Sequence, residues 1–137
     1  MEQGASGSME QRTNESANGL QGMVEAYLDA LQRQDLEGCV NFFSDDASIH
    51  FLGGEFRGSE AIRAWHRDRF IANLEILKTS NFKTEENTVT LDALVTSDKI
   101  KAWKIGKLAG KVAISVKDGR IAEIKLSPKV YNPLSRK

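Results

Sequence analysis

The chain has 137 residues, which is the size of one ordinary domain and too short for two. Hydrophobic residues make up 40% of it and charged residues 28%, a mixture typical of a folded soluble protein rather than a disordered one. The 19 Lys and Arg residues are balanced by 19 Asp and Glu residues, so no net charge draws the chain to nucleic acid or to anionic lipid. We therefore expect no nucleic-acid partner and no membrane partner.

Cysteine and histidine are scarce. Cys39 is the one cysteine, which excludes an internal disulfide, and with only two histidines a structural zinc site is not expected. We expect no other metal or cofactor. No apolar run approaches the ~20 residues that cross a bilayer, and the N-terminus lacks the apolar core of a signal peptide. These observations favour a cytoplasmic protein.

The first 19 residues are mostly Gly, Ser, Asn, Gln, Glu and Thr. Such a segment buries too little surface to offset its ordering entropy, so we predict a flexible tail over residues 1–19. A helical pattern begins at Leu20, where apolar residues recur at spacings of three and four. This stripe consists of Leu20, Met23, Val24, Tyr27, Leu28 and Leu31.

Two further helices are predicted in the front half. Asp35 is suited to the N-cap of a short second helix that extends to Phe43. Residues 47–51 then predict a strand, and the glycines that follow it predict a turn. Ser59 is predicted to cap the third helix. One side of that helix carries Ile62, Trp65, His66, Arg69 and Phe70.

The back half alternates apolar and polar residues, which is the period of a strand. Five strands are predicted, over residues 74–84, 88–97, 99–108, 111–117 and 120–127. Asp118-Gly119 between the last two is typical of a two-residue hairpin loop, because both residues tolerate positive φ. Three helices followed by meandering strands predict a single α+β domain over residues 20–130, with a C-terminal tail at residues 131–137.

Three segments resemble those of a known superfamily. The run VEAYLDALQRQDLEGCVNFFSDDASIHF resembles the opening of ketosteroid isomerases and of the wider SnoaL-like, nuclear-transport-factor-2-like superfamily. EFRGSEAIRAW resembles its third helix with the turn before it, and VKDGRIAEIKL resembles its last hairpin. The resemblance implies a cystatin-like cone, in which three N-terminal helices pack on a strongly curved, mostly antiparallel sheet and a pocket opens at one end. It also implies a homodimer formed through the outer face of the sheet.

The resemblance does not bring the full set of catalytic groups of a ketosteroid isomerase. The catalytic tyrosine falls on Tyr27, but the carboxylate base falls on Phe51 and the second acid on Val112. Neither of those apolar side chains transfers a proton, so the usual isomerase mechanism is not expected. The limonene epoxide hydrolase pattern is no better matched, since one of its aspartates falls on Asp92 but its arginine falls on Thr90.

The resemblance also sets which strand residues face the helices, because side chains alternate between the two faces. The inward positions are all apolar and comprise Ile49, Phe51, Val112, Ile114, Val116, Ala122, Ile124 and Leu126. The outward positions are largely polar, which predicts a pocket with an apolar floor. The residues expected to contact a small hydrophobic ligand are Phe51, Trp65, Trp103, Val112, Ile114 and Ile124. Large core side chains are the alternative interpretation of the two tryptophans.

Three side chains are candidates for chemistry. Tyr27 can donate a hydrogen bond to a carbonyl or oxyanion, although a core tyrosine without a task fits the same stripe. His66 falls where some ketosteroid isomerases carry a tyrosine that bonds to the catalytic one, so it can pair with Tyr27; a histidine at the helix rim is the alternative. Asp92 lies among apolar residues, and the alternation leaves open whether it faces the pocket. His50 is expected on the outer face.

These residues fit more than one function. An isomerase, cyclase or dehydratase would use Tyr27 to stabilise an oxyanion and His66 or Asp92 to move a proton. A non-catalytic module would hold an apolar ligand in the cone. A dimerising or peptide-docking scaffold is a third hypothesis. The sequence favours a protein that handles a ligand and does not separate the enzyme from the binder.

Overall fold

The computed structural model describes residues 8–51, 53–102, 104 and 106–128. Its helices are α1 (Ser8–Gln32), α2 (Leu36–Val40), α3 (Ser59–Ile71) and α4 (Asp98–Ala102). Its strands are β1 (Phe43–Phe51), β2 (Gly54–Arg57), β3 (Glu75–Glu85), β4 (Thr88–Thr96), β5 (Leu108–Lys117) and β6 (Arg120–Pro128).

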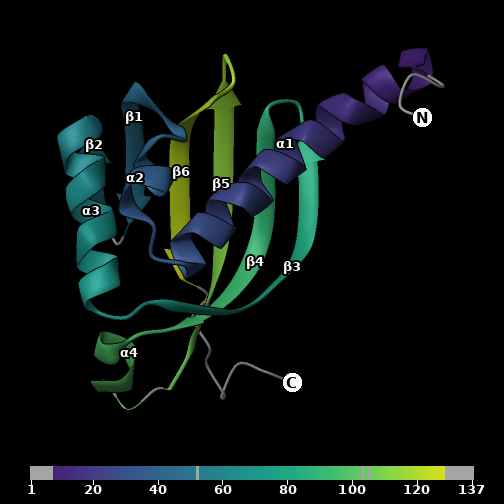
Figure 1. Ribbon diagram of the computed structural model, residues 1–137. Coiled ribbons are helices and arrows are strands. Elements are labelled where there is room, and N and C mark those ends of the chain that lie inside the picture. The colour runs from purple at the N-terminus through teal and green to yellow at the C-terminus, as the bar shows by residue number, and fades with distance from the viewer. Residues whose placement is uncertain (1–7, 52, 103, 105, 129–137) are drawn as a thin grey trace.

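The strands form one curved sheet in the order β2-β1-β6-β5-β4-β3. Neighbouring strands run antiparallel except β1 and β6, which run parallel. α1 lies across one face of the sheet, and α3 packs against β1 and β2 at one side of it (Figure 1). The predicted α+β fold with a curved, mostly antiparallel sheet is confirmed, with a fourth short helix that was not predicted.

α1 is longer than the apolar stripe indicated. It begins at Ser8, so residues 8–19, which we expected in a flexible tail, are helical. Extending a helix costs less than starting one, because each added residue brings one more backbone hydrogen bond. The Met, Glu, Gln and Arg at positions 9–12 are good helix formers, a signal that polarity alone conceals. The rest of the predicted tails, residues 1–7 and 131–137, lies outside the described residues.

The second helix is shorter than predicted. Asp35 caps it as expected, since its side chain accepts a hydrogen bond from the backbone N–H of Gly38 at 3.0 Å. The helix ends before Phe42, and Phe43, which we placed in it, is the first residue of β1. Phe43 pairs with Ile121 of β6, so strand pairing with a distant segment prevails here over the local helical pattern.

Two helix starts also differ from the prediction. Ser59 is the first residue of α3 and not its cap; the N-cap is Gly58, whose φ of 94° suits a glycine. The strand predicted over residues 99–108 is wrong, because α4 extends to Ala102 and β5 begins only at Leu108. Ser97 accepts a hydrogen bond from the backbone N–H of Ile100 at 3.2 Å, which is a helix cap that the apolar alternation conceals.

The last hairpin has the predicted two-residue loop. Asp118 and Gly119 connect β5 to β6 with positive φ angles of 54° and 78°. The pairing of the two strands shifts by one residue between Ser115 and Val116. Alternation is interrupted at such a bulge. As a result Ile121 is buried in the core, whereas Ala122, which we predicted to face inward, is only partly buried.

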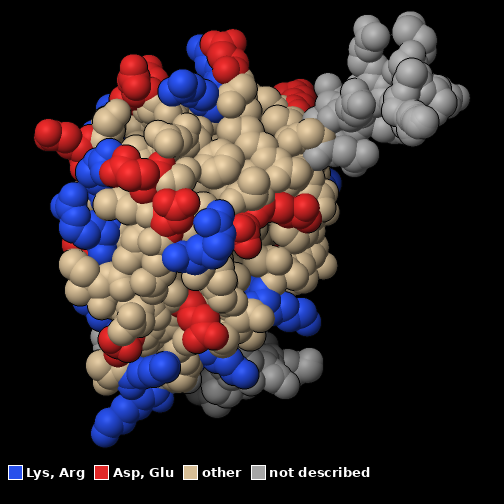
Figure 2. Space-filling view, in the orientation of Figure 1, with Lys and Arg blue, Asp and Glu red and all other residues tan. Residues whose placement is uncertain are grey.

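Side chains of the helices and the sheet meet in one apolar core. The other residues predicted to face inward are buried in it or packed against it: Ile49, Phe51, Val112, Ile114, Val116, Ile124 and Leu126. Polar residues of β5 and β6 such as Lys111 and Lys125 are exposed on the opposite face. Acidic and basic side chains are interspersed on the face that carries α1 (Figure 2). The homodimer through the outer face stays a prediction.

Replacing Gly119 by Ala should destabilise the protein by roughly 1–2 kcal/mol, because its φ of 78° is unfavourable for any residue with a Cβ. No atom lies within 4 Å of the added Cβ, so the cost is in the backbone alone. Gly22→Ala is the matched control: it meets equally open space but lies inside α1, and should stabilise by about 0.5–1 kcal/mol. Urea unfolding measures both, and equal signs would contradict the prediction.

Candidate functional site

Tyr27 of α1 and His66 of α3 form the expected pair. The Tyr27 hydroxyl lies 2.7 Å from Nε2 of His66, and the two side chains are 2% and 0% exposed. The imidazole Nδ1 lies 2.7 Å from the carbonyl oxygen of Ile62, one turn earlier in α3. Since a carbonyl only accepts, Nδ1–H donates a hydrogen bond to Ile62. Nε2 therefore accepts a hydrogen bond from the Tyr27 hydroxyl.

Both members of the pair are neutral near pH 7. Burial lowers the pKa of His66 to about 4, against the opposing effect of the hydrogen bond to Ile62. Burial, with a smaller contribution from Cys39, raises the pKa of Tyr27 well above its ordinary value. The hydroxyl of Tyr27 has a single hydrogen, which is engaged in the hydrogen bond to Nε2 of His66. In this arrangement it is not offered to a substrate carbonyl.

Aromatic rings surround the pair. Tyr27 contacts Phe42 and Phe43 edge to face, at ring-centroid distances of 5.8 and 5.4 Å. His66 contacts Phe43 at 5.4 Å and Trp65 at 5.0 Å, also edge to face. These contacts exclude water from the hydrogen bond and hold both rings in one orientation. As it stands, the pair is a closed and satisfied part of the core.

A second group of side chains lies next to this pair, and we call it the Trp65 cluster: Phe51, Trp65 and Arg69. Phe51 contacts Trp65 edge to face at 6.0 Å. The guanidinium carbon of Arg69 lies over both rings, 5.2 Å from the centre of Phe51 and 5.0 Å from that of Trp65. Phe51 and Trp65 were predicted to contact a ligand. Arg69 was recognised as part of the α3 stripe but not as a site residue, although it follows Trp65 by four residues and so shares its face.

The polar side-chain groups of the Trp65 cluster have no acceptor or counter-ion among the described residues. The indole Nε1–H of Trp65 is buried, and no hydrogen-bond acceptor reaches it in the part of the chain that the structure describes. Within the same residues, no carboxylate lies at salt-bridge distance from the Arg69 guanidinium, which is partly buried. Buried donors in native proteins are nearly always paired. The indole N–H of Trp65 is an exception to this rule, and the guanidinium of Arg69 lies beside it.

Three of the remaining residues predicted to contact a ligand, Val112, Ile114 and Ile124, lie on the face of the sheet that meets the helices. Ile114 pairs with Ile124 across β5 and β6, and Ile124 pairs with Ile49 of β1. These three residues and Val112 are at most 8% exposed, so they form a continuous apolar floor beneath the helices. Trp103 lies outside the described residues.

Asp92 does not join Tyr27 and His66. Its neighbour Leu91 is buried in the core at 1% exposure, so alternation places Asp92 on the opposite face of the sheet. There it accepts a hydrogen bond of 2.6 Å from the side-chain amide of Asn81 and pairs in register with Lys111 of β5. A role for Asp92 in moving a proton at the Tyr27–His66 pair is not supported by this position.

His50 also lies away from the core. Its Nε2 is 3.1 Å from a carboxylate oxygen of Glu123 and 3.3 Å from the hydroxyl of Ser48. Both contacts use the same nitrogen. A nitrogen that donates to Glu123 cannot accept a hydrogen bond from Ser48 at the same time, so these contacts do not form a catalytic triad.

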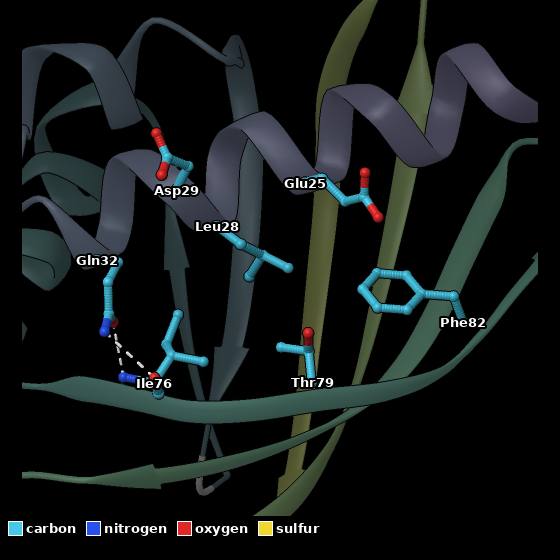
Figure 3. A pocket seen from close by; sticks show the side chains of 7 residues that line it. All are labelled: Glu25, Leu28, Asp29, Gln32, Ile76, Thr79 and Phe82. Carbon is cyan, nitrogen blue, oxygen red and sulfur yellow. Dashed lines mark hydrogen bonds between the residues drawn. The ribbon is translucent and has the colours of Figure 1, made fainter.

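A shallow groove of about 290 Å³ runs between α1 and β3. It is lined by Glu25, Leu28, Asp29, Gln32, Ile76, Thr79 and Phe82 (Figure 3). The Gln32 amide closes one end, because it accepts from the backbone N–H of Ile76 at 2.8 Å and donates to its carbonyl at 3.2 Å. No predicted site residue lines this groove.

Neither a metal centre nor a membrane span is found in the described ranges. No three His, Cys, Asp or Glu side chains come together there as metal ligands would. None of the described helices combines the length and the apolar character that a bilayer crossing needs.

Comparison with known proteins identifies the family. The model of the SnoaL-like domain matches residues 24–124, so the chain belongs to the SnoaL-like domain family. The predicted membership is confirmed. No curated protein matches the sequence.

Solved structures share the fold at low identity. A protein assigned as a ketosteroid isomerase from Kribbella flavida is 13% identical with a TM-score of 0.72, over 85% of this chain and 83% of that one. A protein assigned as a polyketide cyclase from Sinorhizobium meliloti is 20% identical with a TM-score of 0.68, over 77% and 94%. An uncharacterised cystatin-fold protein from Novosphingobium aromaticivorans is 14% identical with a TM-score of 0.64, over 77% and 94%.

The stability of the protein should fall as the pH falls from about 6.5 towards 4. His66 stays neutral in the folded protein down to about 4, whereas it takes up a proton near 6.5 in the unfolded chain. The unfolded state therefore binds more protons in this window, and the loss between pH 6.5 and 5 should be about 2 kcal/mol. Urea unfolding measures it. His66→Gln should remove this contribution and His50→Gln should retain it; an unchanged slope in His66→Gln would contradict the assignment.

Proposed function

We propose that the protein binds a small, largely apolar molecule that carries a hydrogen-bond acceptor, held between α3 and the sheet beside Trp65. The observation that carries this proposal is the buried indole N–H of Trp65, for which the described residues offer no acceptor. Leaving such a donor unpaired costs about 1–3 kcal/mol. An acceptor on a bound molecule recovers that cost, which gives the ligand affinity and a defined orientation.

The surroundings support an apolar body for this molecule. The floor formed by Val112, Ile114 and Ile124 is apolar, and Phe51 and Trp65 add aromatic faces. Sites for small molecules combine such apolar walls with a few placed polar groups. The names of two structural neighbours, a ketosteroid isomerase and a polyketide cyclase, also refer to largely apolar carbonyl compounds.

The side chains at the positions of the catalytic groups favour a binding protein over an enzyme that transfers protons. A phenyl ring stands at position 51 and an isopropyl group at position 112, where the resemblance places the two carboxyl groups of an isomerase. The pair of Tyr27 and His66 is closed by its own hydrogen bonds. The proposed molecule is therefore held and protected by the cone without being converted by the mechanism of the ketosteroid isomerases.

Trp65→Phe tests this proposal with a pair of probes. The neutral ketone 2-acetylnaphthalene should bind to the wild type, and Trp65→Phe should weaken it by about 5- to 10-fold, since the ring stays but one hydrogen bond is lost. The control probe, 2-ethylnaphthalene, has no acceptor and should lose little. Titration calorimetry measures the four affinities. Absence of binding by both probes to the wild type would refute the proposed function.

An enzyme of the isomerase, cyclase or dehydratase type is the second candidate, favoured by the 2.7 Å contact between Tyr27 and His66. Substrate entry would then have to turn the Tyr27 hydroxyl from His66 towards a developing oxyanion. Tyr27→Phe separates the candidates: a carrier keeps its affinity for 2-acetylnaphthalene, whereas an enzyme loses turnover. Mass spectrometry of cyclic and unsaturated ketones incubated with both proteins provides the measurement, and equal conversion would exclude catalysis through Tyr27.

A further inference from the structure

Arg69 is placed differently from the other cations of α3. Arg63 pairs with both carboxylate oxygens of Glu37, and Arg67 is exposed to solvent. Arg69 lies on the inner stripe of the helix with Trp65 and His66, and its guanidinium covers two aromatic rings. Burial lowers the pKa of Arg69, with an opposing contribution from Asp68. A guanidinium in this setting retains its charge but has lost part of its hydration.

The guanidinium of Arg69 lies over two aromatic rings, and no carboxylate of the described residues pairs with it. The rings of Phe51 and Trp65 lie against the cation at 5.2 and 5.0 Å, which is cation–π geometry. The N–H donors of a guanidinium point outward in its own plane. No carboxylate of the described residues reaches those donors. The N–H donors of a guanidinium match the two oxygens of a carboxylate.

We propose that the ligand of the cone is a monocarboxylate with a flat apolar body, whose carboxylate is held by the Arg69 guanidinium and by the indole N–H of Trp65. This inference rests on the proposed function and names the chemical class of its ligand. One negative charge neutralises the one cation of the cluster, whereas a phosphate dianion would leave an uncompensated charge in partly buried surroundings. The aromatic rings and the apolar floor receive the remainder of the molecule.

The unpaired donor and the cation are consistent with a single ligand group. Residues four apart on a helix lie one above the other, and the guanidinium carbon of Arg69 lies 5.0 Å from the centre of the Trp65 ring. A carboxylate has several lone pairs and can accept from both side chains at once. A neutral ketone satisfies the indole but leaves the guanidinium without a counter-ion.

Three naphthalene probes of similar size test the inference by titration calorimetry: 2-naphthoate, 2-naphthamide and 2-acetylnaphthalene. In the wild type, 2-naphthoate should bind at least about tenfold more tightly than either neutral probe. Arg69→Gln should remove this preference, and Arg69→Lys should keep the charge but lose most of the gain, because an ammonium cannot form the two-pronged contact. Arg67→Gln, an exposed change on the same helix, should leave all three affinities unchanged.

A second readout follows the Trp65 indole itself. The N–H resonance of Trp65, assigned by its absence in Trp65→Phe, should move downfield with 2-naphthoate as the donor gains an acceptor. Equal affinities for the three probes, or an unaltered preference in a folded Arg69→Gln protein, would overturn the carboxylate assignment and leave the proposed binding function in place. Failure of all three probes to bind to the wild type would instead overturn both.

Discussion

The hydrogen bond between Tyr27 and His66 is the contact on which the arrangement of the helices depends. The two residues are 39 positions apart, and their bond joins α1 to α3 directly, with α2 packed beside both helices. The Ile62 carbonyl fixes the imidazole from the other side, so the ring cannot rotate without breaking two buried hydrogen bonds. Because His66 is held in this way, the side of α3 that carries it faces inward, which places Trp65 and Arg69 against Phe51.

Local periodicity is sufficient to predict much of this arrangement. The apolar spacing of α1 places Tyr27 inward, and the spacing of α3 places His66 on the stripe that meets it. Asp118 and Gly119 determine the last hairpin through their backbone preferences alone. These features depend on residues close together in the chain, where side-chain direction follows directly from helix or strand geometry. The resemblance to the SnoaL-like family then supplied the order of the elements, which short-range patterns do not contain.

The features that were missed depend on distant partners. Phe43 leaves its helix because β6 pairs with it, and Ile121 replaces Ala122 in the core because the pairing of β5 and β6 shifts. Alternation places Asp92 opposite Val89 and Leu91, but only the burial of those two residues shows that it is their face that meets the helices. The position of Arg69 over two aromatic rings requires the end of β1 to meet the last turn of α3. None of these contacts leaves a periodic signal in the sequence.

The residue at position 51 links the missing chemistry to the proposed ligand. A carboxylate there would lie beside the guanidinium of Arg69, would form an ion pair with it, and would occupy the donors that a ligand needs. Phe51 instead contacts the cation through its ring face and supplies no counter-ion. The same substitution therefore removes the proton-transferring base of a ketosteroid isomerase and makes a cation available within the cone. Under the proposed function, the negative charge that pairs with Arg69 comes from the bound molecule, because no carboxylate of the described residues supplies it.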